Sequence, residues 1–188
     1  MKMSELEELR RRVERLESRA EISELISAYA IACDEHDIPR LGSLFTEDAV
    51  FDTPSKLMVA NGRKGIVDMF IKVLGIRGPG YHWTHDHFIK VDAANPDRAT
   101  GLVLSHAETS PNKRPSLAAM KYADNYRKVD GRWHFEKRVL SFLYYVPAAE
   151  YATALNGDLR LVTPTGERIK ADYPESLACW QAFEKAKG

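Results

Sequence analysis

Residues 117–146 read LAAMKYADNYRKVDGRWHFEKRVLSFLYYV, and this stretch decides the fold class. Asp130 and Gly131 separate two long runs in which apolar and polar side chains largely alternate. An Asp-Gly pair between such runs is the strongest short-range signal for a β-hairpin, because both turn positions need positive φ. We therefore predict a hairpin of two long strands. On its second strand, alternation puts Leu140, Phe142 and Tyr144 on one face and Trp133, Phe135, Val139 and Leu143 on the other.

Two more strand-like runs precede this hairpin, at residues 82–91 and 98–109. Together the four runs predict an antiparallel meander. One face of such a sheet can line a pocket, while the other needs a cover of helices or of a second subunit. We therefore expect a homo-oligomer.

Helical patterns dominate the chain before the meander. Ser4 and Glu7 form a capping box for a first helix, and Ser18 and Glu21 form another that predicts a second helix starting there. Further helices are expected near residues 37–45 and 66–74, short strands at 49–53 and 57–60, and a helix stop at 75–80. This order predicts an α+β fold.

Composition and length limit the classes of function. The chain has 188 residues, enough for one domain, and its 27 basic residues balance 27 acidic ones, so we predict neither a nucleic-acid partner nor a membrane. Cys33 and Cys179 have no disulfide framework or CxxC spacing, which suits a reducing, cytoplasmic location. We predict a single domain over residues 1–188, with a core at 5–146 and a carboxy-terminal extension at 147–188.

Asp34 is the first candidate for a catalytic residue. It ends the apolar helical run YAIACD at residues 29–34, so its carboxylate is expected at the edge of a buried space. An Asp near a helix end is also commonly a local hydrogen-bonding or solvated residue. Tyr29 lies about 140° away on a regular helix. On spacing alone it is a core residue.

His82 opens the first long strand, in the segment YHWTHDH at residues 81–87. An imidazole at this place can act as a base near neutral pH. Three histidines within six residues are also a pattern that could indicate a metal site. On a regular strand His85 and His87 share a face while His82 points to the other, and no Glu or Cys completes a ligand set. We predict no metal; if one were bound, its ligands would be His85, His87 and His106.

Arg138 stands in the middle of the last strand, on the predicted face of Leu140, Phe142 and Tyr144. A guanidinium among such neighbours is costly unless it is paired. Two alternatives remain open. Arg138 forms an ion pair with Glu136, two residues away on the same face, or it is a cation aimed into the pocket at a carboxylate, an oxyanion or a departing group.

The order of helices, short strands, a helix and a meander ending in DGRWHFEKR (residues 130–138) resembles the SnoaL-like branch of the nuclear-transport-factor-2-like superfamily. The resemblance covers residues 5–146. It is strongest to the group that contains bile acid 7α-dehydratase and hexachlorocyclohexane dehydrochlorinase, with scytalone dehydratase more distant. It implies a cone-shaped, curved antiparallel sheet wrapped by helices around a central pocket, in a homotrimer.

The resemblance extends to four positions of the site. Enzymes of that group have an Asp at the end of the second helix, a His at the start of the first long strand and an Arg on the last strand, which correspond to Asp34, His82 and Arg138. Tyr29 matches a tyrosine that precedes the Asp by five residues. The family's Asn four residues after the His is Asp86 here, and the tail from residue 147 is longer than expected.

These residues lead to the hypothesis of a cofactor-independent elimination. His82, oriented by Asp34, removes a proton next to a carbonyl or enone, Tyr29 donates to the developing enolate oxygen, and Arg138 steadies the substrate or the leaving hydroxyl. The side chains predicted to line the pocket are Phe88, Met120, Tyr122, Phe142 and Tyr144. The expected substrate is therefore a small, largely apolar ring system.

Other functions remain open, because one fold hosts many. A ketosteroid-isomerase-like isomerase or a polyketide-cyclase-like enzyme would use the same pocket and base without expelling a leaving group. A non-catalytic binding protein would need only the pocket. An interaction module would use the apolar seam of the first helix, at residues 6–16, to dock another chain.

Overall fold

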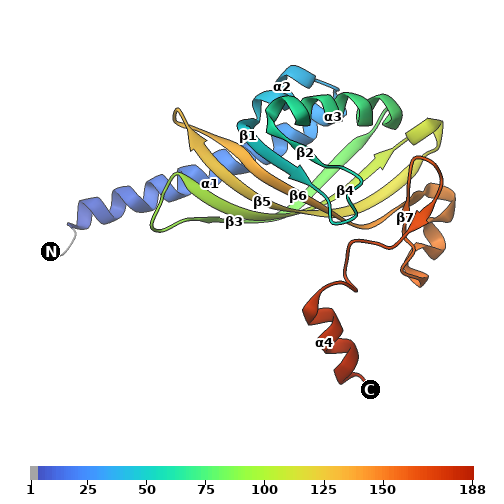
Figure 1. Cartoon of the computed structure of the whole chain (residues 1–188). Coiled ribbons are helices and arrows are strands. Elements are labelled where there is room, and N and C mark those ends of the chain that lie inside the picture. Colours follow the sequence, from blue (N-terminus) through green and yellow to red (C-terminus); the bar gives the residue numbers. More distant parts are fainter. Residues whose placement is uncertain (1–3) are drawn as a thin grey trace.

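The structure, a computed structural model, describes residues 4–188 (Figure 1). In chain order the elements are α1 (Glu5–Asp34), α2 (Ile38–Ser43), β1 (Phe45–Asp52), β2 (Ala60–Asn61), α3 (Gly62–Arg77), β3 (Tyr81–Val91), β4 (Arg98–Thr109), η1 (Pro111–Lys113), β5 (Ser116–Val129), β6 (Arg132–Pro147), η2 (Ala148–Asn156), β7 (Leu161–Val162), β8 (Arg168–Ile169) and α4 (Ala178–Ala186). The predicted order of helices and strands is confirmed, with shifts of a few residues at the boundaries, except that the first two predicted helices form the single helix α1.

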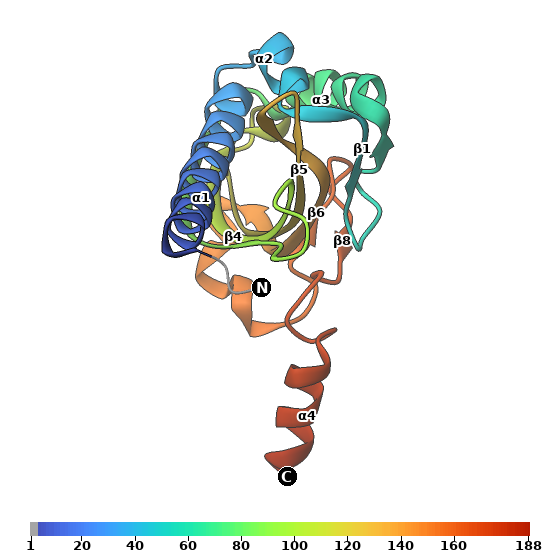
Figure 2. The same ribbon diagram turned by 90° about the vertical axis from the view of Figure 1, so that its left-hand side faces the viewer.

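One curved, open sheet organises the chain. Its strands follow the order β2-β1-β6-β5-β4-β3, so the predicted meander β3 to β6 is present and β1 extends it, parallel to β6. The turn of the last hairpin has positive φ at Asp130 (49°) and Gly131 (77°), as the Asp-Gly pair predicts. Figure 2 shows the strands curling around the interior, with α1 along one side and α2 and α3 across the top. The α+β class with a curved sheet is confirmed.

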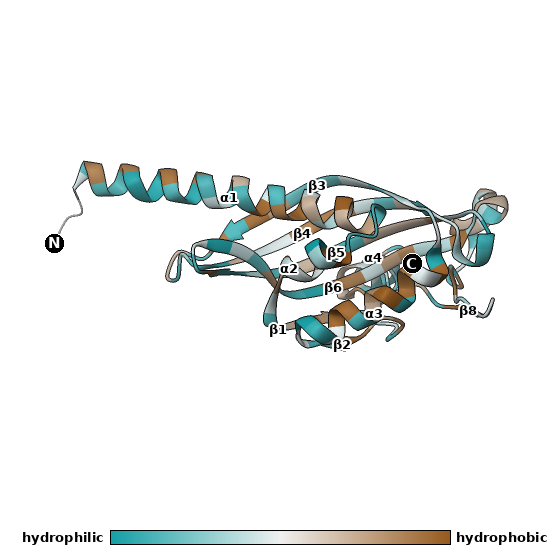
Figure 3. Cartoon of the chain, turned by 90° about the horizontal axis from the view of Figure 1, so that it is seen from above, coloured by the Kyte–Doolittle hydropathy of each residue, from teal (hydrophilic) through white to brown (hydrophobic). Residues whose placement is uncertain are grey.

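Helix α1 is continuous, so the predicted second start at Ser18 is wrong. Ser4 is the true cap: its hydroxyl accepts from the backbone N–H of Glu7 at 3.2 Å, and its own N–H donates to the Glu7 carboxylate at 2.8 Å. Ser18 lies buried in mid-helix, and no Gly or Pro near it interrupts the chain. The apolar seam predicted for residues 6–16 lies on an exposed part of α1 that extends past the sheet (Figures 1 and 3).

Three β-bulges in the meander β3 to β6 decide which of its side chains face the interior. At each, one strand has an extra residue relative to its partner, which reverses inward and outward positions beyond that point. One bulge lies in β3 between Thr84 and His87. The other two lie in β6, at Glu136 and Leu143. The alternation of the sequence does not show them, and several predicted faces change as a result.

The two bulges of β6 correct the faces predicted for that strand. Phe135 and Arg138, which alternation separates, both point inward with exposures of 0% and 1%. Tyr144 was predicted on the pocket face but packs on the outer side against Tyr151 of η2, with ring centroids 5.5 Å apart. Tyr145 turns inward instead, where its hydroxyl bonds Thr109 of β4 at 2.7 Å.

The bulge of β3 has the same effect on two other predictions. His87 pairs with the buried Val103 and so moves to the inner side of the sheet, whereas His85 stays on the outer side. The expectation that these two histidines share a face is therefore wrong. Phe88, predicted to line the pocket, points outward and is 69% exposed.

The extension after β6 partly rejoins the sheet. Strand β7 pairs in parallel with β6 and antiparallel with β8, while α4 lies apart from the sheet (Figure 1). Asp172 ties this extension to the core, because its carboxylate accepts the backbone N–H groups of Ser55 and Phe142, each at 2.8 Å. Whether residues 147–188 count as part of a single domain stays a prediction.

In the described part of the chain, no helix combines the length and the apolar character that crossing a membrane requires. Cys33 is buried and Cys179 exposed, and both are free thiols. A cytoplasmic location stays a prediction.

Candidate active site

Asp34 and His82 meet at the junction of α1 and β3. Asp34 is the last residue of α1, and His82 is the second residue of β3, which packs against that helix. The backbone N–H of His82 donates to Oδ2 of Asp34 at 2.8 Å, and the ring Nδ1 lies 2.6 Å from Oδ1. The side chain of His82 is 4% exposed and that of Asp34 is 15% exposed. One carboxylate thus holds both the backbone and the ring of His82 in place.

This contact determines the tautomer of the histidine. An ionised carboxylate only accepts hydrogen bonds, so Nδ1 carries the ring proton and the lone pair of the neutral ring lies on Nε2. Among residues 4–188, Nε2 has no hydrogen-bond partner. The arrangement is that of a general base with its orienting carboxylate.

The surroundings keep His82 neutral. Burial lowers the pKa of His82 below its usual value, the hydrogen bond to Asp34 opposes this, and the positive charges of Arg77 and Arg138 lower the pKa further. Near pH 7 the imidazole is therefore unprotonated and able to accept a proton. Burial also raises the pKa of the Cys33 thiol to about 11, so this neighbour is not a thiolate.

Arg138 is paired, but with neither partner predicted for it. Its Nε and Nη2 donate to Oδ1 and Oδ2 of Asp124 at 2.8 and 2.7 Å, and both side chains are almost fully buried. The guanidinium carbon lies 4.1, 4.2 and 3.9 Å from the ring centroids of Tyr29, Tyr122 and Phe135.

Asp124 supplies the counter-charge that Arg138 needs in a buried environment. Burial acts to lower the pKa of Arg138, but the charge and hydrogen bonds of Asp124 raise it overall. Glu136, the predicted partner, instead contacts Arg98 and Arg127 on the outer side. Within the described residues, Nη1 of Arg138 is buried and has no partner. Nη1 is the one nitrogen of this guanidinium that the ion pair leaves free.

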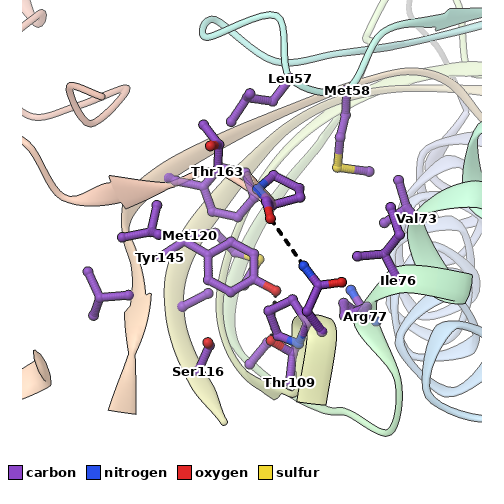
Figure 4. Close-up of a pocket in the computed structure, with 18 of the residues that line it drawn as sticks. Leu57, Met58, Val73, Ile76, Arg77, Thr109, Ser116, Met120, Tyr145 and Thr163 are labelled. Atoms are coloured by element: carbon purple, nitrogen blue, oxygen red, sulfur yellow. Dashed lines mark hydrogen bonds between the residues drawn. The ribbon is translucent and has the colours of Figure 1, made fainter. Parts of the chain in front are cut away.

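A cavity of about 370 Å³ lies between α3, the inner face of β4 to β6 and the turn between β7 and β8 (Figure 4). Of the side chains predicted to line it, Met120, Tyr122 and Phe142 do so. Phe88 and Tyr144 do not, because the bulges turn them to the outer side.

The catalytic candidates differ in how they relate to this cavity. Tyr29 is part of its wall. His82, Asp34 and Arg138 are not. His82 stands directly opposite the wall residue Ala107 across the strand pair, and Arg138 stacks on the wall residues Tyr29 and Tyr122. Asp34 is linked to this wall through its hydrogen bonds to His82. The His-Asp pair therefore flanks an apolar cavity.

The profile of the SnoaL-like domain matches residues 14–139, about two thirds of the chain. The chain belongs to the SnoaL-like family. This SnoaL-like protein is 29% identical over 141 residues to gamma-hexachlorocyclohexane dehydrochlorinase of Sphingobium indicum, covering 73% of the chain and 88% of the relative. A second relative, hexachlorocyclohexane dehydrochlorinase 1 of the same species, is 28% identical over the same length. By their names, both relatives are dehydrochlorinases of hexachlorocyclohexane.

Solved structures agree with this assignment. A type 2 hexachlorocyclohexane dehydrochlorinase has a TM-score of 0.66 and 25% identity, covering 72% of the SnoaL-like chain and 91% of that protein. A scytalone dehydratase-like protein from Novosphingobium aromaticivorans has a TM-score of 0.64 and 21% identity, covering 71% and 89%. The second likeness supports the fold only.

His85 and His106 form a pair of their own on the outer side of this SnoaL-like sheet. Nε2 of His85 and Nδ1 of His106 are 2.8 Å apart, a hydrogen bond between the two rings. In residues 4–188, no group of three or more His, Cys, Asp or Glu side chains converges as a metal site requires. His87, the third ligand proposed for a metal, is on the other face of the bulged strand.

Sequence reasoning missed two parts of the SnoaL-like cavity wall. One is Arg77, at the end of α3. The sequence around Arg77 predicts only the end of a helix and gives no sign of a functional residue. The other is the turn at residues 163–166, in an extension that the family match does not cover. Asn112 fastens this turn, since its side-chain amide donates to the carbonyl of Pro164 at 3.1 Å (Figure 4).

Proposed function

We propose that this protein is a cofactor-independent lyase that performs a dehydratase-type elimination on a small, largely apolar cyclic molecule. The observation that carries the proposal is the buried His82–Asp34 pair, in which Nδ1 is bound to the carboxylate and Nε2 has no partner among residues 4–188. His82 stands opposite Ala107 of the apolar cavity wall. The dehydrochlorinase relatives support the same reaction class, since their name describes loss of a hydrogen and a chlorine.

In the proposed step, Nε2 of His82 takes a proton from a carbon atom of the substrate. The electron pair of that C–H bond becomes the new double bond, and the bond to the leaving group on the neighbouring carbon breaks with its electrons on the leaving group. A departing hydroxide takes that proton from the imidazolium of His82 and leaves as water. A halide leaves as the anion, and the imidazolium then gives its proton to solvent. Asp34 stabilises the imidazolium that forms in between.

Tyr29 and Arg138 have supporting roles in this proposal. Tyr29 is part of the cavity wall and can donate its hydroxyl proton to an oxygen that gains charge. Burial raises the pKa of Tyr29, which keeps it a donor. Arg138 already shares its charge with Asp124, so its role is limited to the field it exerts and to the donor Nη1. Met120, Tyr122 and Phe142 would contact the apolar ring.

Replacing the base tests the proposal. A screen of ring ketones, hydroxy-enones and chlorinated rings, with the products analysed by mass spectrometry, first identifies a substrate that loses water or hydrogen chloride. An isomerase or cyclase would leave the mass of the substrate unchanged. We expect His82→Ala and Asp34→Asn to lower turnover by about 10²- to 10⁴-fold without unfolding the protein. His85→Ala is the matched control, because His85 lies on the outer side, and it should leave turnover unchanged. Near-wild-type activity in His82→Ala would refute the assignment.

We also propose that copies of the chain associate, as a trimer by resemblance. The outer side of β3 and β4 exposes large apolar side chains that nothing in the described chain covers, with Trp83 45%, Phe88 69% and Leu104 43% exposed. Light scattering after size-exclusion chromatography measures the mass. Phe88→Asp should convert the oligomer to smaller species, and a wild-type monomer at micromolar concentration would contradict the proposal.

A further inference from the structure

Among residues 4–188, one cation of the cavity wall has no protein counter-charge. The described residues that line it include Arg77 and Arg114 but no Asp or Glu. Arg114 is 57% exposed, and its Nη2 lies 2.5 Å from the Glu150 carboxylate. Arg77 has no such partner in residues 4–188. The positive charge of the cavity is therefore that of Arg77.

The fold holds Arg77 in a defined place. It is the last residue of α3, and its carbonyl accepts the backbone N–H of Ser110 at 3.0 Å. Gly78 ends the helix with φ +63°, and a Cβ there would lie 2.8 Å from Oγ of Ser110, so only glycine fits. Figure 4 shows the Arg77 side chain on the side of the cavity where Thr109 and the hydroxyl of Tyr145 also lie.

One edge of this guanidinium is prepared for a ligand with two oxygens. Nε and Nη2 of Arg77 are both buried, and neither has a hydrogen-bond partner among the described residues. In Arg138 the same two nitrogens hold the two oxygens of Asp124, at 2.8 and 2.7 Å. A buried donor without an acceptor is costly, and here two lie side by side on one edge. A positive charge at a helix end is itself favourable, but that interaction does not require burying an unused edge.

We propose that Arg77 binds a carboxylate, or another planar anion with two oxygens, of the substrate. The substrate class is then an apolar ring compound that carries an acid group, a deepening that rests on the proposed function of the same cavity. With the acid group at Arg77, the ring lies along Met120, Tyr122 and Phe142 toward Tyr29, all of which line the cavity. A volume of about 370 Å³ accommodates such a molecule.

Two probes of equal shape and different charge test this assignment. Isothermal titration calorimetry compares 2-naphthoate with its neutral analogue naphthalene-2-carboxamide on the full chain. We expect the wild type to bind the carboxylate about 10-fold or more tightly than the amide. Arg77→Met should abolish this preference and leave amide binding unchanged. Arg77→Lys keeps the charge without the two-nitrogen edge and should keep only part of the preference.

Arg114→Met is the matched control, because it removes the other cation of the wall, and it should retain the full preference. Equal binding of the two probes by the wild type, binding of neither, or a preference that persists in Arg77→Met would overturn the proposal. His82→Ala separates this proposal from the elimination. If His82→Ala still prefers the carboxylate and no substrate is ever turned over, the anion site stands and the lyase proposal is refuted. If the wild type turns over neutral rings but does not prefer the carboxylate, the lyase proposal stands and the anion site is refuted.

Discussion

Removing Asp124 tests whether the buried ion pair with Arg138 holds the interior together. The side chains of Asp124 and Arg138 are 0% and 1% exposed, and two hydrogen bonds of 2.8 and 2.7 Å join them. In Asp124→Ala the guanidinium stays charged, because arginine does not lose its proton in proteins, and it is left without a counter-charge. Breaking a buried pair in this way costs about 3–5 kcal/mol of the free energy of unfolding.

Urea and thermal unfolding followed by circular dichroism measure this cost. At about 2–4 °C per kcal/mol for a chain of this size, the melting temperature of Asp124→Ala should fall by about 6–20 °C. The double variant Asp124→Leu/Arg138→Met replaces the pair with apolar groups and should recover most of the loss. Asp68→Ala is the control: Asp68 pairs with Lys64 on the surface of α3 at 2.6 Å, and its loss should cost no more than about 0.5 kcal/mol. If Asp124→Ala is as mild as Asp68→Ala, the reasoning is refuted.

Two further predictions concern the base and the packing of the sheet. A proton NMR titration should place the pKa of His82 below 6.5. This pKa should be higher in Arg77→Met, which removes a positive charge, and lower in Asp34→Asn, which removes a negative one. The kcat/KM should fall as the pH drops through the pKa of His82, and a pKa above 6.5 would contradict the electrostatics. Gly101→Ala should cost about 1–3 kcal/mol, because its Cβ would lie 2.8 Å from Cε2 and Oη of Tyr126, whereas Gly75→Ala, with nothing within 4 Å, should be neutral or stabilising in the same denaturant assay.

The order of elements could be predicted because each signal is local. The turn of the last hairpin depends only on positive φ at Asp130 and Gly131, which this residue pair favours, and the hairpin in turn predicts the meander. The contact between Asp34 and His82 has no such local cause, since 48 residues separate them. Sequence spacing could not produce it, and only the resemblance to a family pointed to it.

The bulges explain why several strand side chains were predicted on the wrong face of the sheet. One extra residue at Glu136 changes the partner of Arg138 across the hairpin, because an unbroken register from the Asp-Gly turn would place Lys137, not Arg138, opposite Asp124. A bulge needs no marker residue, and one inserted position in a largely apolar strand leaves the pattern almost unchanged. Sequence reasoning therefore found that Arg138 needs a partner but not which residue it is.

The charges of the interior connect the proposed base with the proposed anion site. Asp34 raises the pKa of His82, while burial and the charges of Arg77 and Arg138 lower it, and the balance leaves a neutral imidazole. The charge of Arg138 is largely offset by Asp124, but that of Arg77 has no counter-charge among residues 4–188. An acid group bound at Arg77 would cancel its effect on His82, so the imidazole would become more basic when the substrate is in place. A neutral ring of the same shape would meet a weaker base, and the same side chain would then contribute both to binding and to the rate of proton removal.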